Sequence, residues 1–132
     1  MKKFSLLDRA GYDYKHAALA YDNYTGDEGD LDIIAYHVHQ TLEKLMKFEL
    51  EMVGVEFPFT HEVHILYECM SENGLKPPAW IFDNYVVLNN YATQTRYGEN
   101  LIASYRLLTM LKDLTGEYLN KVRREQGPCN EG

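Results

Sequence analysis

Apolar residues recur every three or four positions through the segment from Asp30 to Gly54. Its apolar residues recur at the 3.6-residue period of an α-helix and fall on one stripe, as a helix that faces a core requires. Asp30 can accept hydrogen bonds from free backbone N–H groups at the start, and Gly54 can end the helix in a left-handed conformation. We therefore expect a long helix with this buried stripe: Leu31, Ile34, Ala35, Val38, Leu42, Leu45, Met46, Met52 and Val53.

The polar residues of the same segment divide into a solvent face and a flank. Glu49 is the exception, because it lies at the centre of the apolar stripe, where an unpaired buried carboxylate is costly. Either the helix turns slightly to expose Glu49, which we favour, or this carboxylate has a partner in the interior. The helical projection places Gln40, Glu43, Lys47 and Glu51 opposite the stripe, and His37, Thr41, Lys44 and Phe48 beside it.

The helical period recurs in four further segments. Residues 6–24 predict a first helix, and Thr60 can cap a third that stops near Asn73-Gly74. A fourth helix follows Pro78, and the last runs from about Glu99 to Arg124. No segment combines period-2 alternation with hairpin turn residues. The pattern predicts an all-α protein, an up-and-down antiparallel bundle of about five helices, in a single domain over residues 1–132 with a frayed tail at 126–132.

Charge and composition narrow the class of protein. The formal net charge of −7 argues against a broad nucleic-acid surface, which needs an excess of Lys and Arg. RNA is therefore not the expected partner, and only a local basic pocket could bind it. Cys69 and Cys129 form no C-x-x-C pair, and Cys69 is expected to be buried as a small apolar residue. Because no stretch reaches the roughly 18 apolar residues of a membrane span, we expect a cytoplasmic protein without membrane contact.

The sequence lacks the usual motifs of metal and covalent catalysis. His37 and His39 project about 200° apart on one helix, so they cannot share a metal ion. His61 and His64 can share a face with Glu68, but no fourth ligand is evident, and zinc needs three or four converging ligands. Phosphate-loop and nucleophile-elbow motifs are absent from the sequence. We therefore expect capping or structural roles for these histidines, and neither a metal nor a cofactor.

Arg96 and Tyr97 lie at the predicted break before the last helix. An arginine at a helix junction can bind free carbonyl groups of the preceding helix or a carboxylate, which is a structural role. Its planar guanidinium also suits bidentate contacts to phosphate, and the start of the last helix adds free N–H groups. Lys44, Lys47 and His61 could complete such an anion site if the bundle brings them close.

Three ordered motifs resemble the HEPN family of small helical domains: His37-x-x-Gln40-x-x-Glu43-Lys44-x-x-Lys47, then Phe57-x-x-Thr60-His61-Glu62, then Tyr91-x-x-x-x-Arg96-Tyr97-Gly98. The resemblance covers about residues 5–125. It implies an all-α bundle that is commonly a homodimer. Many members look like metal-independent endoribonucleases of toxin or defence systems, with an arginine followed four to six residues later by a histidine. Others are thought to bind nucleotides without catalysis, and often accompany a small nucleotidyltransferase.

The chain departs from the ribonuclease pattern, because no histidine follows Arg96 or Arg106 at that spacing. A nuclease of this kind needs a group that assists proton transfer at the ribose 2′-hydroxyl. The first hypothesis is therefore a non-catalytic HEPN-like protein that binds a nucleotide or docks on a nucleotidyltransferase. The second is an endoribonuclease with a displaced base at His37 or His61, and the third is a plain interaction module. The resemblance implies a ligand site formed from Arg96, Tyr97, Lys44, Lys47, His37, Gln40 and His61.

Overall fold

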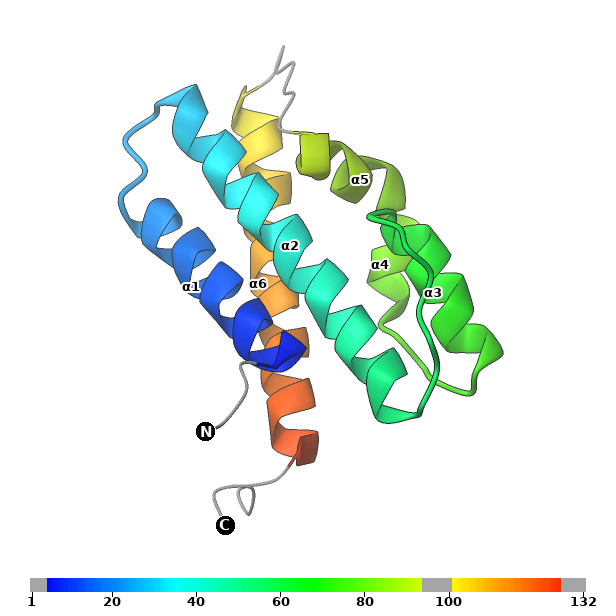
Figure 1. The fold of residues 1–132 in the computed structure, drawn as a ribbon. Helices are drawn as coiled ribbons and strands as arrows, with labels where there is room; N and C mark the ends of the chain where they lie inside the picture. Colours follow the sequence, from blue (N-terminus) through cyan, green and yellow to red (C-terminus); the bar gives the residue numbers. More distant parts are fainter. Residues whose placement is uncertain (1–4, 94–100, 127–132) are drawn as a thin grey trace.

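The structure is a computed structural model that describes residues 5–93 and 101–126. Figure 1 shows that these residues form a bundle of helices, and no strand occurs among them. The all-α helical bundle predicted from the sequence is confirmed. The helices are α1 (Leu6–Asp22), α2 (Glu28–Met52), α3 (Val63–Glu72), α4 (Ala79–Asp83), α5 (Tyr85–Thr93) and α6 (Leu101–Gln126).

Helix α2 is the central element, because α1, α3, α5 and α6 all pack against it (Figure 1). Its predicted stripe is buried from Leu31 to Met46. Met52 and Val53 were predicted in the stripe but are 57% and 49% exposed, since they lie where the helix ends and the chain turns away at Gly54. Gly54 has the expected left-handed conformation, with φ of +75°. The N-cap is Asp27 rather than Asp30, and its carboxylate accepts a hydrogen bond from the Gly29 N–H at 2.9 Å.

Helices α1 and α6 pack on α2 and on each other (Figure 1). Ser5 and Asp8 fix the start of α1 as a capping box, in which each side chain accepts a hydrogen bond from the other residue's backbone N–H at 3.0–3.1 Å. The two helices approach closely at Gly116, where an added Cβ would lie 2.7 Å from Cζ of Tyr14. Helix α6 extends to Gln126, two residues past the predicted end at Arg124.

The segment between α2 and α3 returns along α2, so that α2 and α3 run in the same direction (Figure 1). The return is anchored where the His61 carbonyl accepts a hydrogen bond from His39, in the middle of α2, at 2.7 Å. Thr60 does not cap α3 as predicted. Its hydroxyl accepts a hydrogen bond from the Glu62 N–H at 3.1 Å in the turn before the helix, and Glu62 is the N-cap.

The predicted fourth helix is divided into α4 and α5 at Asn84, which explains six helices where about five were expected. The Asn84 side chain donates to the Trp80 carbonyl at 2.8 Å and thereby closes the short α4. Cys69, expected to be buried, is only partly so and is packed against the core. Cys129 and the predicted break at Arg96 lie outside the described residues.

Glu49 has the interior partner that we considered the less favoured alternative. The Tyr118 hydroxyl of α6 donates to its carboxylate at 2.6 Å. Burial, together with this negative charge, raises the pKa of Tyr118 well above its ordinary value, so its hydroxyl stays a donor. The pair ties α2 to α6. Among the helices that the structure describes, none has the length and apolar character needed to cross a membrane.

Candidate functional site

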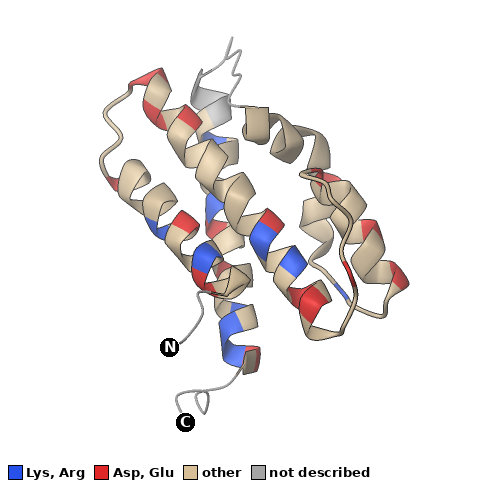
Figure 2. Ribbon diagram, viewed as in Figure 1, with Lys and Arg blue, Asp and Glu red and all other residues tan. Residues whose placement is uncertain are grey.

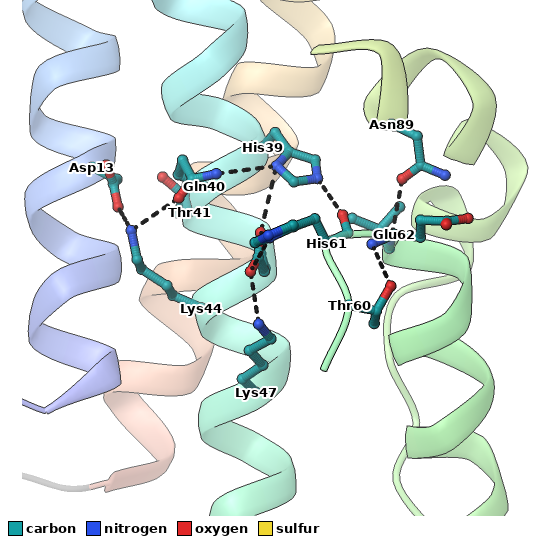
Figure 3. A network of polar contacts seen from close by, with 12 residues as sticks. Asp13, His39, Gln40, Thr41, Lys44, Lys47, Thr60, His61, Glu62 and Asn89 are labelled. Carbon is teal, nitrogen blue, oxygen red and sulfur yellow. Dashed lines mark hydrogen bonds and ion pairs between the residues drawn. The ribbon is translucent and has the colours of Figure 1, made fainter. Parts of the chain in front are cut away.

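Glu43 is the centre of a polar cluster on α2, and the prediction that it faces solvent is wrong. Its side chain is only 7% exposed. Lys47 Nζ donates to the carboxylate at 2.7 Å, and His61 Nδ1 donates to it at 3.0 Å (Figure 3). Burial acts to raise the pKa of Glu43, but the hydrogen bonds from Lys47 and His61 outweigh it and leave the pKa below its ordinary value. The carboxylate is therefore ionised, and it holds the side chains of Lys47 and His61 in place.

His39 belongs to the same cluster, with its Nδ1 3.8 Å from the Glu43 carboxylate, and is fully buried. Its Nε2 must carry the proton, because its partner at 2.7 Å is the His61 carbonyl oxygen. Burial lowers the pKa of His39, so the ring stays neutral. Neither His39 nor Glu43 was among the site residues expected from the sequence, although Glu43 belongs to the family motif. His39 also carried a signal, because it is spaced from Ala35, Leu42 and Met46 as a core position of the same stripe.

A second cluster joins α1 to α2 around Asp13. Its carboxylate accepts a hydrogen bond from His37 Nδ1 at 3.0 Å. It accepts a second, short one from Lys44 Nζ (Figure 3). Lys44 also donates to the Gln40 side-chain oxygen at 3.2 Å, which links this cluster to His39 and its neighbours. Asp13 could not be predicted as a partner, because the sequence gives no register between α1 and α2.

Asn89 of α5 performs the capping that Thr60 was expected to perform. Its side-chain oxygen accepts the Val63 N–H at 2.9 Å at the start of α3 (Figure 3). Its amide nitrogen lies 3.2 Å from His64 Nδ1. His64 also packs on Tyr85, whereas the His61 ring contacts Glu43, so the two histidines have different partners. Within residues 5–93 and 105–126, no group of three His, Cys, Asp or Glu side chains could hold a metal ion.

A cavity of about 370 Å³ opens beside these clusters, between α2, the start of α3 and the end of α5. Gln40 and His61, two of the candidates from the sequence, both line it. Lys44, Lys47 and His37 do not line it, and each contacts a carboxylate. Arg96 and Tyr97 lie outside the described residues. The cavity is lined by Tyr36, Gln40, His61, Glu62, Asn89, Ala92 and Thr93.

The family model described as HEPN domain matches residues 5–124. The chain belongs to the HEPN family. The resemblance inferred from the ordered motifs is thereby confirmed. No curated protein and no solved structure shows significant similarity to the chain.

The HEPN motif residues fall into two chemical roles in this fold. Glu43, Lys44 and Lys47 neutralise one another's charges or that of Asp13. Gln40 and His61 instead present polar groups to the cavity, and the His61 side chain is 73% exposed. A histidine held by a carboxylate and open to solvent can bind an anion when protonated, or accept a proton when neutral.

Proposed function

We propose that this protein is a cytoplasmic, non-catalytic HEPN protein that binds a nucleotide in the cavity beside Gln40 and His61. The cavity itself is the observation on which the proposal rests. Its volume of about 370 Å³ lies within the usual range of small-molecule sites, roughly 300–1,000 Å³. Tyr36 offers a ring for stacking of a base, and the side-chain amides of Gln40 and Asn89 offer both donors and acceptors.

The pairing of the nearby lysines supports Arg96 as the phosphate contact. Lys44 and Lys47, the other candidates, are already paired with Asp13 and Glu43. Arg96 follows the cavity residue Thr93 by three positions in the sequence, and three residues span at most about 11 Å. The guanidinium fork is suited to two phosphate oxygens. In this proposal Tyr97 lies beside the bound phosphate.

Isothermal titration with ATP, GTP, CTP and UTP tests this function. We expect binding in the micromolar to millimolar range, weakened at least about tenfold by Arg96→Ala and by Gln40→Ala, as loss of a hot-spot contact requires. Lys121→Ala is the matched control, because Lys121 is an exposed α6 residue paired with Glu125 and does not line the cavity. Absence of binding at millimolar nucleotide, or equal binding by all variants, contradicts the proposal.

We also propose two protein partners, on the family resemblance alone. The first is a second copy of the chain, and the second is a small nucleotidyltransferase. Light scattering coupled to gel filtration tests the homodimer by its mass. Co-expression with a nucleotidyltransferase encoded in an adjacent reading frame, followed by the same measurement, tests docking. A monomeric mass in both experiments contradicts both partners.

The His61–Glu43 pair favours a second candidate, an endoribonuclease with a displaced base. Glu43 orients the His61 ring from its Nδ1 side at 3.0 Å, as an orienting carboxylate does in acid–base catalysis. Incubation of the pure protein with structured RNA tests this candidate. Cleavage that is lost in both His61→Ala and Arg96→Ala, but kept in Lys121→Ala, supports the nuclease and overturns the non-catalytic proposal.

A further inference from the structure

Phe59, in the segment between α2 and α3, is completely exposed to solvent. Met52 and Val53, where α2 ends, are also about half exposed. Burying a phenylalanine side chain is favourable, and this ring gains nothing from burial within the isolated chain. An apolar surface of this kind marks an interaction site when it is held in a fixed shape.

The segment that carries Phe59 is anchored on both sides. On one side Val55 and Phe57 pack against the core, and Lys47 Nζ lies 5.4 Å from the centre of the Phe57 ring. On the other side His61 is bound twice, by its carbonyl to His39 and by its ring to Glu43. The polar cluster on α2 therefore fixes the segment that displays Phe59. A ring displayed on a fixed segment loses little further entropy on binding.

A hollow of about 590 Å³ lies beside the ring, and its lining is acidic. Glu51 and Glu56 line it, with Gly54, Val55, Phe57 and Phe59, and none of these lining residues is basic. The C-terminal end of α2, which carries the negative end of the helix dipole, borders this hollow. The last turn of α2 contains no basic residue that would offset the negative charge. Figure 2 shows the contrast with the lower end of α6, where Arg123 and Arg124 occupy the last turn.

We propose that this surface, made of Phe59 and the hollow beside it with Glu51 and Glu56, is the docking site for a basic amphipathic helix of a partner protein. The apolar side of such a helix covers Phe59 and fills the hollow, while its Lys or Arg residues face the two glutamates and the end of α2. A second copy of the chain is a poor occupant, because it would bring the same carboxylates together. Anionic lipid is repelled for the same reason. The site shares no lining residue with the nucleotide cavity.

Fluorescence anisotropy with two labelled model peptides tests the docking site. Both peptides carry the same leucine stripe on a short helix, and one has Lys where the other has Glu. We expect the Lys peptide to bind the wild-type chain, with affinity reduced at least about tenfold by Phe59→Ala and also reduced by the double change Glu51→Gln and Glu56→Gln. Ile33→Ala is the control, because Ile33 is a half-exposed apolar residue near the other end of α2.

Each result bears on the proposal separately from the nucleotide experiment. No binding of the Lys peptide at millimolar concentration overturns it, as does equal binding of the Glu peptide or an equal loss in Ile33→Ala. A dimer that becomes a monomer in Phe59→Ala identifies a second copy as the occupant and also overturns it. Because the Phe59 ring makes no buried contact, the variant is expected to keep the wild-type circular dichroism and urea midpoint, so a loss of peptide binding reports on the surface itself.

Discussion

Glu43 keeps its charge at a position where the side chain is almost entirely removed from water, and it does so through Lys47 and His61. We predict that Glu43→Gln lowers the free energy of unfolding by about 2–4 kcal/mol, because it leaves the partly buried Lys47 ammonium without its counter-charge. Urea unfolding measures this difference. Glu51→Gln, an exposed change on the same helix, is expected to stay within about 0.5 kcal/mol of wild type. Equal effects of the two changes would contradict the role assigned to Glu43.

The buried ring of His39 predicts how stability depends on pH. Burial places its folded-state pKa below the unfolded value of 6.5, so the unfolded chain binds more protons in this range. The free energy of unfolding should therefore be fully retained above about pH 6.5 and fall as the pH drops below it. Urea midpoints at about pH 7 and about pH 5.5 measure the fall. Glu43, whose pKa is also depressed, loses its contribution only at lower pH, below about 4.5.

A variant separates His39 from the other histidines in that experiment. His39→Gln keeps a side-chain donor for the His61 carbonyl but removes the titrating ring. The variant should lose less stability than wild type between the two pH values, whatever its stability at neutral pH. A fall as large as that of wild type would assign the pH dependence to another group.

The sequence predicts which residues belong to the site better than it predicts the side chains with which they pair. Gln40 and His61, which the sequence singles out by their place in the family motifs, both line the cavity. Lys44 and Lys47 were expected to be free for an anion, whereas both are paired. The partner of Lys44 is Asp13, on a different helix, and the helical period of one segment carries no information about its register against another.

At the scale of elements, the contact between α1 and α6 depends on the missing side chain at Gly116. We predict that Gly116→Ala lowers the free energy of unfolding by about 1–2 kcal/mol, because the added Cβ would lie 2.7 Å from Tyr14 Cζ and force the ring to move. In a Tyr14→Ala background the same change should be neutral or stabilising by up to about 1 kcal/mol, since alanine favours the helix over glycine. A double-mutant cycle by urea unfolding measures the coupling. Additive effects would show that the two residues do not meet.

Helix interiors are predictable from the apolar period, whereas the connections depend on tertiary contacts. The start of α3 is set by Asn89, which lies on α5 and caps Val63 across the fold. Asn84 divides the expected fourth helix by a local side-chain bond to Trp80, which the apolar period does not register. The return of residues 53–62 along α2 depends on His39, a buried polar group in a position that the period alone assigns to the core.

At the scale of the whole molecule, the contacts concentrate on α2. It packs against α1, α3, α5 and α6, whereas α4, among the described helices, packs closely against α3 and α5 alone (Figure 1). The prediction that residues 30–54 form a long core-facing helix was correct because an amphipathic helix of that length can bury its stripe only against several others. The order in which the other helices surround it was not available from the sequence.

This arrangement predicts an order of local opening. Amides in the buried middle of α2, such as Leu42 and Leu45, should exchange with solvent only on global unfolding, because four helices must separate to expose them. Amides of α4 should exchange by a smaller opening that frees α3 and α4 while α1, α2 and α6 remain together. Native-state hydrogen exchange at increasing urea measures both free energies and the surface exposed in each opening.

A substitution in the buried face of α3 tests whether α3 and α4 open together. Leu66→Ala removes a buried side chain of α3 and should destabilise the chain by about 2–4 kcal/mol. If α3 and α4 open as a unit, the variant lowers the global free energy seen at Leu42 and Leu45 and also the smaller free energy seen in α4. Leu111→Ala, an equally buried change in α6, should lower only the global value, because α6 stays folded during the outer opening. Equal lowering of the α4 value by both variants would mean that the bundle opens as one cooperative unit.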